Sequence, residues 1–261
     1  FLARLEAIAV LTKSFHANPL SVEAWRTKDD VELRTTKWSA EQEEFWRINV
    51  KDSTDKAATF ERRMHITGGP GAGKTVAIIH TTYAAAKAGA RVLILCPTGA
   101  LVHAYKERLP PTDQIMVETL HSGFSIARKV DMNTYAPPGR LRRYDLIFID
   151  EASQIGDDIF DCIVVGVREL PQKPFVVVGA DYQQVAPIGG GKVGREICDS
   201  IKTIELKEVH RTDDKKLLES LRLIRKKQPA RGEIRECFGS RLLDCDFQEA
   251  AKYGLAINAL N

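Results

Sequence analysis

A glycine-rich segment, residues 68–75, contains residue types that can hold a chain of phosphate groups. Its sequence Gly-Gly-Pro-Gly-Ala-Gly-Lys-Thr fits the pattern G-x-x-x-x-G-K-[ST] at every specified position, and it follows an apolar-ending stretch, as a strand-loop-helix unit requires. Glycines let backbone N–H groups turn toward an anion, Lys74 can reach the outer phosphates, and the Thr75 hydroxyl can ligate Mg²⁺. The segment therefore predicts a nucleoside triphosphate site. The alternative is a glycine-rich turn that matches by chance.

Two adjacent carboxylates, Asp150 and Glu151, end the apolar run at residues 144–149. In this arrangement the first carboxylate can hold Mg²⁺, and the second can polarise a water that attacks the triphosphate. The alternative is a solvated acidic turn, which is common at the end of a strand. Downstream of a phosphate loop, the pair favours hydrolysis of the nucleotide over binding alone.

The segments that position these groups alternate between strand and helix patterns from residue 64 onward. Strands are expected at residues 64–67, 91–96, 115–119, 144–149, 175–178 and 203–209. Helices are expected at residues 74–87, with Gly89 as a C-cap, and at 100–109 and 157–170. Because the strands are almost continuously apolar, the predicted fold class is α/β, with a parallel sheet and helices on both faces.

Composition limits the function classes only weakly. The chain has 261 residues, of which 44% are hydrophobic, which is enough for one large or two modest domains. Its 38 Lys and Arg against 35 Asp and Glu neither support nor exclude nucleic acid as a partner. The five cysteines form no C-x-x-C pair, and no apolar run approaches the roughly 20 residues of a membrane span. We therefore expect an intracellular protein without a membrane partner, whether nuclear, mitochondrial, or in a bacterial or viral cytoplasm.

The phosphate loop, together with Asp150-Glu151-Ala152-Ser153, resembles motifs I and II of superfamily 1 helicases, particularly the RecD-like branch that includes the PIF-type DNA helicases. The resemblance covers residues 38–211 and rests on several motifs in the family's order and spacing. It implies a RecA-like P-loop NTPase domain that uses ATP and Mg²⁺. Thr75 and Asp150 would hold the metal, and Lys74 and Glu151 would act in catalysis. The implied nucleotide contacts in the loop are Gly69, Pro70, Gly71, Ala72, Gly73, Lys74, Thr75 and Val76.

Three further segments resemble parts of the family that contact ATP. Residues 38–42 resemble the Q motif, which implies that Gln42 recognises adenine. Residues 178–188 resemble motif III, which places Gln184 as the sensor of the γ-phosphate. Residues 206–211 resemble motif IV, which makes Arg211 the candidate arginine finger. The copy of motif III departs from the family at Ala180, Val185 and Ala186. Taken singly, Gln42 could be a surface helix residue and Arg211 a surface ion-pair residue.

Two segments resemble the parts of relatives that lie along a single nucleic-acid strand. Residues 95–100 resemble motif Ia, and residues 119–124 resemble the Thr-Ile-His-Ser segment. The implied contacts with nucleic acid are Pro97, Thr98, Gly99, Thr119, His121 and Ser122. His121 could instead be a capping or core histidine, and Phe124 could stack on a base or belong to the core. A basic group could contact phosphates or form a solvated face; its members are Arg128, Lys129, Arg140, Arg142 and Arg143.

The resemblance also implies a domain organisation. Residues 1–37 would form a helical and irregular segment, residues 38–229 the RecA-like domain 1A, and residues 230–261 the start of a truncated second domain, so the chain is interpreted as a fragment. The leading hypothesis is an ATP-dependent DNA helicase that moves 5′-to-3′ on single-stranded DNA. An RNA helicase of the same superfamily and a nucleotide-gated protein-binding module without motor activity are the alternatives, and protein partners are not predicted.

Overall fold

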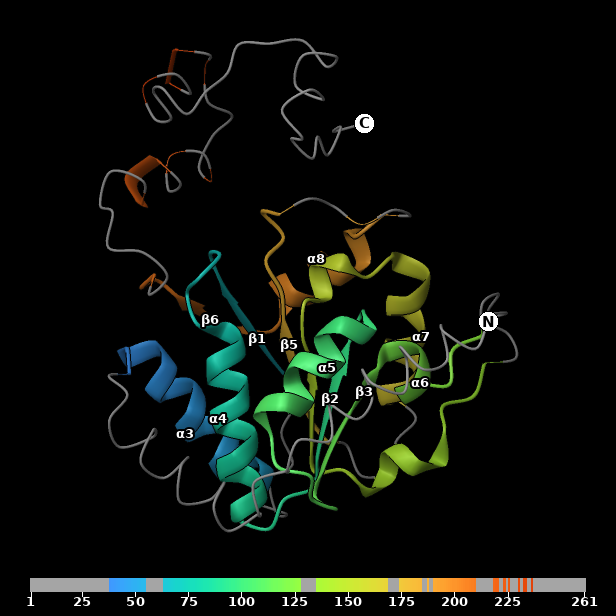
Figure 1. Cartoon of the computed structure of the whole chain (residues 1–261). Helices are drawn as coiled ribbons and strands as arrows, with labels where there is room; N and C mark the ends of the chain where they lie inside the picture. The colour runs from blue at the N-terminus through green and yellow to red at the C-terminus, as the bar shows by residue number, and fades with distance from the viewer. Residues whose placement is uncertain are drawn as a thin grey trace, which may run out of the picture. The chain divides into compact units, whose positions relative to one another are not determined.

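The computed structural model describes residues 38–54, 63–127, 135–168, 174–184, 187 and 190–209, with scattered positions between 218 and 236 (Figure 1). Contacts divide the chain into two compact units, residues 1–209 and 210–261. The strands and helices named below belong to the first unit. The helical and irregular segment expected at residues 1–37 lies outside the described residues.

Six strands form one sheet in which every neighbouring pair is parallel. Their order across the sheet is β3-β2-β4-β5-β1-β6. The strands are β1 (Arg63–Gly68), β2 (Val92–Cys96), β3 (Ile115–Thr119), β4 (Leu146–Ile149), β5 (Phe175–Gly179) and β6 (Lys202–Leu206). Because all strands run the same way, the loops that follow them meet at one edge, the carboxyl edge of the sheet.

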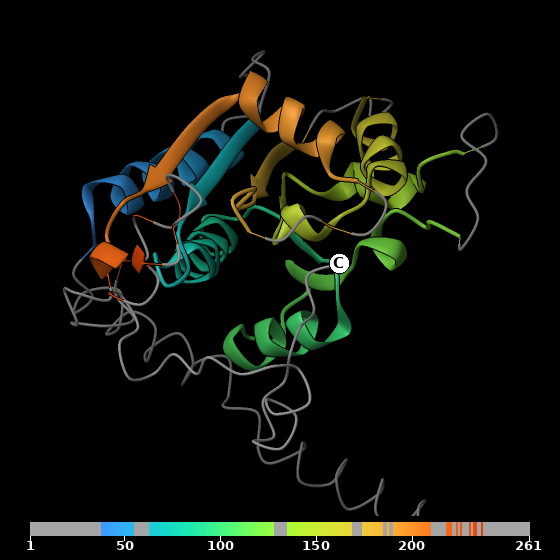
Figure 2. The same ribbon diagram turned by 90° about the horizontal axis from the view of Figure 1, so that it is seen from above.

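Helices connect these strands and cover both faces of the sheet. They are α3 (Ala40–Thr54), α4 (Lys74–Lys87), α5 (Gly99–Arg108), α6 (Leu120–Gly123), α7 (Asp157–Arg168) and α8 (Lys192–Ser200), with 3₁₀ turns η1 (Gly139–Arg143) and η2 (Ala152–Gln154). In the view from above, α4 and α5 lie on one side of the strands, and α7 and α8 lie on the other (Figure 2). The predicted α/β fold class is confirmed.

The sheet separates two apolar cores, because successive strand residues point to opposite faces. In β2, Ile94 and Cys96 pack in the core that includes residues of α3, α4 and α5. Leu93 and Leu95 pack in the core that includes residues of α6, α7 and α8. A strand buried on both faces must be apolar at every position, which explains the continuous Val, Ile and Leu of the sequence.

Most predicted elements match the structure within two residues, but the last strand is shorter than expected. β6 ends at Leu206 and does not reach residue 209. Its partner is β1, and Leu206 lies opposite Gly68, where β1 gives way to the phosphate loop. Residues 207–209 therefore have no strand to pair with. Helices α3, α6 and α8 were not among the predicted elements.

Three of the cysteines lie in the described residues, and all three are free and buried. They are Cys96, Cys162 and Cys198. Buried free cysteines of this kind pack as small hydrophobic residues. Among the described helices, none combines the length and the apolar character that a bilayer crossing would need.

Candidate functional site

The phosphate loop lies between β1 and α4 at the carboxyl edge. Gly71 and Gly73 have φ of 82° and 85°, in the left-handed region that favours glycine. The loop closes on Lys74, whose Nζ donates a hydrogen bond to the carbonyl oxygen of Gly68 at 2.8 Å. Lys74 is buried, and α4 begins at this residue, so an ammonium and a helix N-terminus present positive charge to the same place. The loop is therefore shaped to hold an anion.

Asp150 follows the last residue of β4 and is 1% exposed. Its Oδ2 accepts a hydrogen bond from the hydroxyl of Tyr105 at 2.6 Å, and its Oδ1 accepts one from the N–H of Glu151 at 3.0 Å. Burial raises the pKa of Asp150, while these two bonds and the Lys74 ammonium oppose the rise. Burial and the Asp150 charge also raise the pKa of Tyr105 well above its usual range, so the phenol stays protonated and donates.

The residues around Asp150 fit a magnesium ion. The Thr75 hydroxyl lies near both Asp150 and Tyr105. A hydroxyl and a buried carboxylate beside a phosphate loop are oxygen ligands of the kind that Mg²⁺ prefers. Thr75 and Asp150 are therefore suited to hold a Mg²⁺ ion.

Glu151 occupies a strained turn directly after Asp150. Its φ is 52°, a left-handed conformation that costs of order 1–3 kcal/mol for a residue with a side chain. Among the described residues, its buried Oε2 has no hydrogen-bond partner. Burial, and secondly the Asp150 charge, raise the pKa of Glu151, whereas Lys74 lowers it. A carboxylate with a raised pKa and an available oxygen is suited to take a proton from water.

The turn after β5 places Gln184 near this edge. Asp181 organises the turn, because its Oδ1 accepts from the N–H of Gln183 at 3.3 Å and its Oδ2 accepts from Nε2 of Gln184 at 3.0 Å. Gln184 is exposed and lines a hollow of about 270 Å³ together with Ser153 and Tyr182. Ala180 is one of the positions at which this chain departs from motif III. It does not have a positive φ, so alanine causes no backbone strain here.

Gln42 has a structural role at the start of α3. The Ser39 hydroxyl accepts from the N–H of Gln42, and Oε1 of Gln42 accepts from the N–H of Ser39, both at 3.2 Å. This reciprocal pair is a capping box. Gln42 is 4% exposed, so it is not the surface helix residue of the alternative interpretation. Trp38, directly before Ser39, packs edge-on against His80 of α4, with ring centroids 4.9 Å apart.

The two segments predicted to contact nucleic acid lie side by side at the same edge. β2 and β3 are neighbours, and Cys96 lies opposite Thr119 in their register, so the loops that follow them begin together. Thr98 caps α5 by accepting from the N–H of Leu101, and Thr119 caps α6 by accepting from the N–H of Ser122. A hydroxyl that accepts a hydrogen bond can still donate its proton, so both threonines can donate to a phosphate oxygen.

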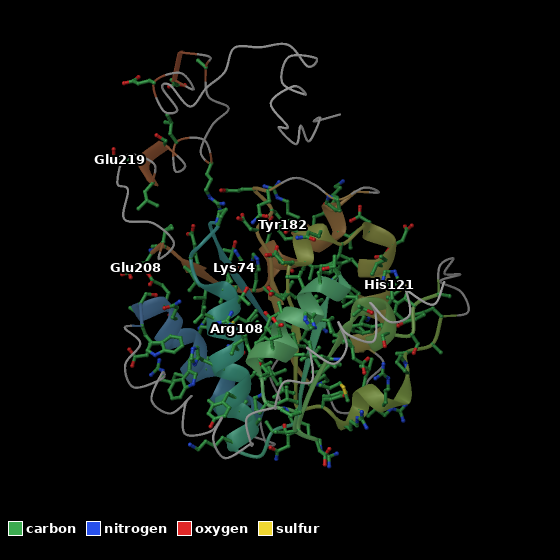
Figure 3. The ribbon with its side chains drawn as sticks, in the orientation of Figure 1. Lys74, Arg108, His121, Tyr182, Glu208 and Glu219 are labelled. Atoms are coloured by element: carbon green, nitrogen blue, oxygen red, sulfur yellow. The ribbon has the colours of Figure 1, made fainter. Side chains whose placement is uncertain are left out.

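The exposed positions of these loops agree with a surface for a ligand. Thr98, Gly99, His121 and Ser122 are exposed, and Pro97 and Thr119 are half-buried. His121 is therefore not a core histidine. Figure 3 labels it on α6, away from Lys74 at the start of α4. The structure thus places the loop suited to bind phosphate and the exposed polar residues after β2 and β3 at different parts of the same edge of the sheet.

Phe124 and Arg140 both make contacts inside the protein near the end of β3. Phe124 is fully buried in the core on the α7 side, so it does not stack on a base from this position. Arg140 donates to both carboxylate oxygens of Glu118 at 2.7 Å and to the carbonyl oxygen of Ser122 at 2.6 Å. This ion pair lowers the pKa of Glu118. Arg140 is thus engaged within the protein, which is a different role from the phosphate contact considered for it.

Comparison with known proteins then decides the family. The family model of the AAA domain, AAA_30, matches residues 51–237, which is more than half of the chain. This chain belongs to that AAA domain family. As an AAA domain it has the P-loop NTPase fold, in agreement with the parallel sheet and the phosphate loop.

Two helicases resemble this AAA domain. The ATP-dependent RecD2 DNA helicase of Deinococcus radiodurans is 26% identical over 150 residues, which are 58% of this chain and 20% of that protein. The crystal structure of the Pif1 helicase from Candida albicans has a TM-score of 0.58 and 20% identity, over 82% of this chain and 50% of that chain. This AAA domain therefore spans about a fifth of one relative and half of the other. The predicted resemblance to the RecD and Pif1 type of superfamily 1 helicase is confirmed.

Some predicted positions of the AAA domain lie outside the described residues. They are Arg211, Val185, Ala186, Arg128 and Lys129. Tyr105 was not among the predicted site residues, although it contacts Asp150. Its position in the middle of an expected helix carries no motif, so only the three-dimensional structure reveals this contact.

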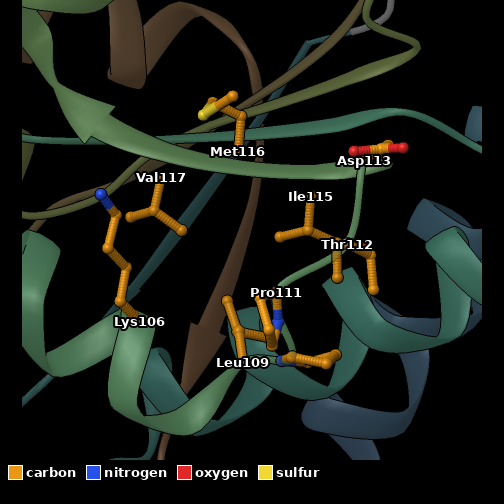
Figure 4. A pocket seen from close by; sticks show the side chains of 9 residues that line it. Lys106, Leu109, Pro111, Thr112, Asp113, Ile115, Met116 and Val117 are labelled. Carbon is orange, nitrogen blue, oxygen red and sulfur yellow. The ribbon is translucent and has the colours of Figure 1, made fainter. Parts of the chain in front are cut away.

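A larger hollow lies at the opposite edge of the sheet. Its volume is about 400 Å³, and it is lined by the loop that follows α5 and by the first part of β3 (Figure 4). Lys106, Thr112 and Asp113 supply polar groups, and Leu109, Ile115 and Val117 supply apolar ones. Because β3 begins here, this hollow is separate from the phosphate loop, which follows the end of β1.

Proposed function

We propose that this AAA domain is the ATPase domain of a helicase that couples ATP hydrolysis to translocation on single-stranded DNA, with 5′-to-3′ polarity. The main observation that supports the proposal is that the candidate nucleotide and nucleic-acid loops leave the sheet at the same edge. The phosphate loop, the two carboxylates after β4 and the exposed loops after β2 and β3 all leave the same side of one rigid parallel sheet. A change at one of these loops can therefore act on the others through short strands.

The nucleotide half of the edge has the groups that ATP hydrolysis needs. Backbone N–H groups of the loop and Lys74 would bind the phosphates, and Thr75 and Asp150 would hold Mg²⁺, which neutralises charge that develops on the transferred phosphoryl group. Glu151 would receive the proton of the attacking water at its buried Oε2. Gln184 would sense the γ-phosphate, and Arg211 would stabilise its developing charge.

Recognition of adenine is assigned to Gln42. Its Oε1 is engaged by Ser39, which fixes the orientation of the carboxamide. Because the capping box already orders the Gln42 side chain, little rotamer entropy would be lost when the base binds. The preference for ATP rests on the resemblance of residues 38–42 to the Q motif.

Nucleic acid would be bound through its backbone and not through base edges. Hydroxyls and backbone groups of Pro97, Thr98, Gly99, Thr119, His121 and Ser122 carry no pattern that would read a sequence. Contacts of this kind suit a motor, which must release and rebind at every step. No described residue marks a preference for ribose over deoxyribose, so the choice of DNA rests on the DNA helicase to which the chain is similar.

The motor needs more than this domain. We propose that residues 38–229 form the RecA-like domain 1A, preceded by an N-terminal segment at residues 1–37, and that residues 230–261 begin a second domain. Closure of two domains on ATP and their opening after hydrolysis would convert phosphate release into movement. A single domain would bind nucleotide without translocating.

The test is ATP hydrolysis by the chain together with its second domain, with and without single-stranded DNA or RNA. A Lys74→Ala variant serves as the control for contaminating ATPases. Stimulation by DNA that the control lacks is the expected result, and an oligonucleotide with a duplex at one end then gives the polarity. Stimulation by RNA alone would indicate an RNA helicase. Turnover that responds to neither polymer would contradict a motor and indicate a nucleotide-gated binding module.

A further inference from the structure

Tyr105 makes an unusual contact for a residue in the middle of α5. It is 1% exposed, and its hydroxyl lies 2.6 Å from Oδ2 of Asp150. A tyrosine that serves only as apolar filling does not need to bury a hydroxyl against a carboxylate, because phenylalanine fills almost the same volume without a polar group. The contact therefore has a physical consequence beyond packing.

The bond limits how Asp150 can rotate. Oδ2 is held by Tyr105, and Oδ1 is held by the N–H of Glu151 at 3.0 Å. With one donor on each oxygen, the plane of the carboxylate is fixed, and the remaining lone pairs point in set directions. A ligand that is already oriented loses less entropy when a metal binds.

The residue that supplies this bond comes from the helix that starts at the β2 loop. α5 is capped by Thr98, seven positions before Tyr105, which is about two helical turns. Tyr105 also lies near Thr75, the other residue suited to hold the metal. The phenol that is bonded to Asp150 therefore belongs to the helix that begins at the loop of residues 97–99.

We propose that Tyr105 is a positioning residue of the magnesium site, through which α5 fixes the orientation of Asp150. The proposal rests on the assignment of Thr75 and Asp150 as the residues that hold Mg²⁺ with ATP. It does not depend on translocation or on the kind of nucleic acid.

The test is the affinity for a fluorescent, non-hydrolysable ATP analogue, measured with Mg²⁺ and again in excess EDTA. Tyr105→Phe removes the hydroxyl and keeps the ring. We expect it to weaken Mg²⁺-dependent binding by roughly 10–100-fold, as is typical for an outer partner of a metal ligand, with unchanged binding in EDTA. Raising the Mg²⁺ concentration should restore binding by the variant.

Tyr144→Phe is the matched control. Tyr144 is also a buried tyrosine, with its hydroxyl bonded to Arg143, but it precedes β4 at the other edge of the sheet. This variant should bind the analogue like the unmodified chain under both conditions.

Two results would overturn the proposal. Equal loss of binding with and without Mg²⁺ would show that Tyr105 only supports the fold, and an unchanged response to Mg²⁺ would show that the bond does not matter. Neither result bears on the motor, whose failure would appear as the absence of stimulation by single-stranded DNA in the unmodified protein.

Discussion

The ammonium of Lys74 donates a hydrogen bond to the carbonyl oxygen of Gly68 at 2.8 Å, across the mouth of the phosphate loop. Lys74 is 7% exposed, so a positive charge is held inside the loop before any phosphate arrives. Water screens a buried charge poorly, which strengthens its attraction for an anion. This geometry supports the proposal that Lys74 binds the triphosphate.

We therefore expect Lys74→Ala to remove most nucleotide binding. A charged hydrogen bond to a phosphate is worth about 1.5–3 kcal/mol, which corresponds to a loss of roughly 10–100-fold in affinity. Titration with a fluorescent ATP analogue measures it. Lys87→Ala, in the last turn of the same helix, is the control, because Lys87 is exposed and far along α4. Equal affinity in both variants would contradict the role of Lys74.

Glu151→Gln should separate binding from hydrolysis. The amide keeps the size of the side chain but cannot accept the proton of the attacking water, so turnover should fall by roughly 10²–10⁴-fold. Nucleotide affinity should change little. Single-turnover hydrolysis in the active protein measures the chemical step directly. Hydrolysis at the unmodified rate would mean that another group is the base.

Thr119→Ala combined with His121→Ala should weaken binding of single-stranded DNA and leave ATP affinity unchanged in its absence. Thr119 also caps α6, and loss of a cap costs about 1 kcal/mol. Thr119→Ser with His121→Ala retains the cap and is the comparison that isolates His121. Fluorescence anisotropy of a labelled oligonucleotide reports both variants. Parallel loss of DNA and ATP binding would indicate a folding role for the pair.

The ion pair between Arg140 and Glu118 should stabilise the β3 loop. It is bidentate, and its side chains are only 31% and 17% exposed, so it should contribute about 1 kcal/mol, more than a typical surface pair. A double-mutant cycle with Arg140→Ala and Glu118→Gln, followed by urea denaturation, measures this coupling. Arg140→Lys keeps the charge but loses the paired geometry, and it should recover only part of the stability. Additive effects in the cycle would show that the pair is not coupled.

Stability should fall at mildly acid pH because of His65. Burial is the main cause that lowers the pKa of this side chain below its usual 6.5. As the pH falls through 6.5, the unfolded chain takes up a proton that the folded chain does not, so the free energy of unfolding decreases until the folded pKa is reached. Urea denaturation at several pH values detects this. The His65→Asn variant has no titratable group at this position, so its free energy of unfolding should decrease less between a pH above this window and a pH below it. A pH profile identical to that of the unmodified protein would refute the assignment.

The local pattern of the sequence was enough to predict the phosphate loop, the two carboxylates and most strands. These features depend on neighbouring residues: glycines at residues 71 and 73 for a left-handed turn, and apolar runs for strands buried on both faces. The ends of the elements depend on pairing between distant segments. β6 stops at Leu206 because its partner β1 stops at Gly68, so the residues after Leu206 have no strand opposite them.

Contacts between distant segments were decided only by the tertiary structure. Tyr105 and Asp150 are 45 positions apart, and Glu118 and Arg140 are 22 apart, so no local pattern brings either pair together. The strand order of the sheet, and the packing of α5 and η1 against it, place them in contact. The residue types of this chain thus determine which chemistry is possible, and the topology of the sheet decides which of those groups meet.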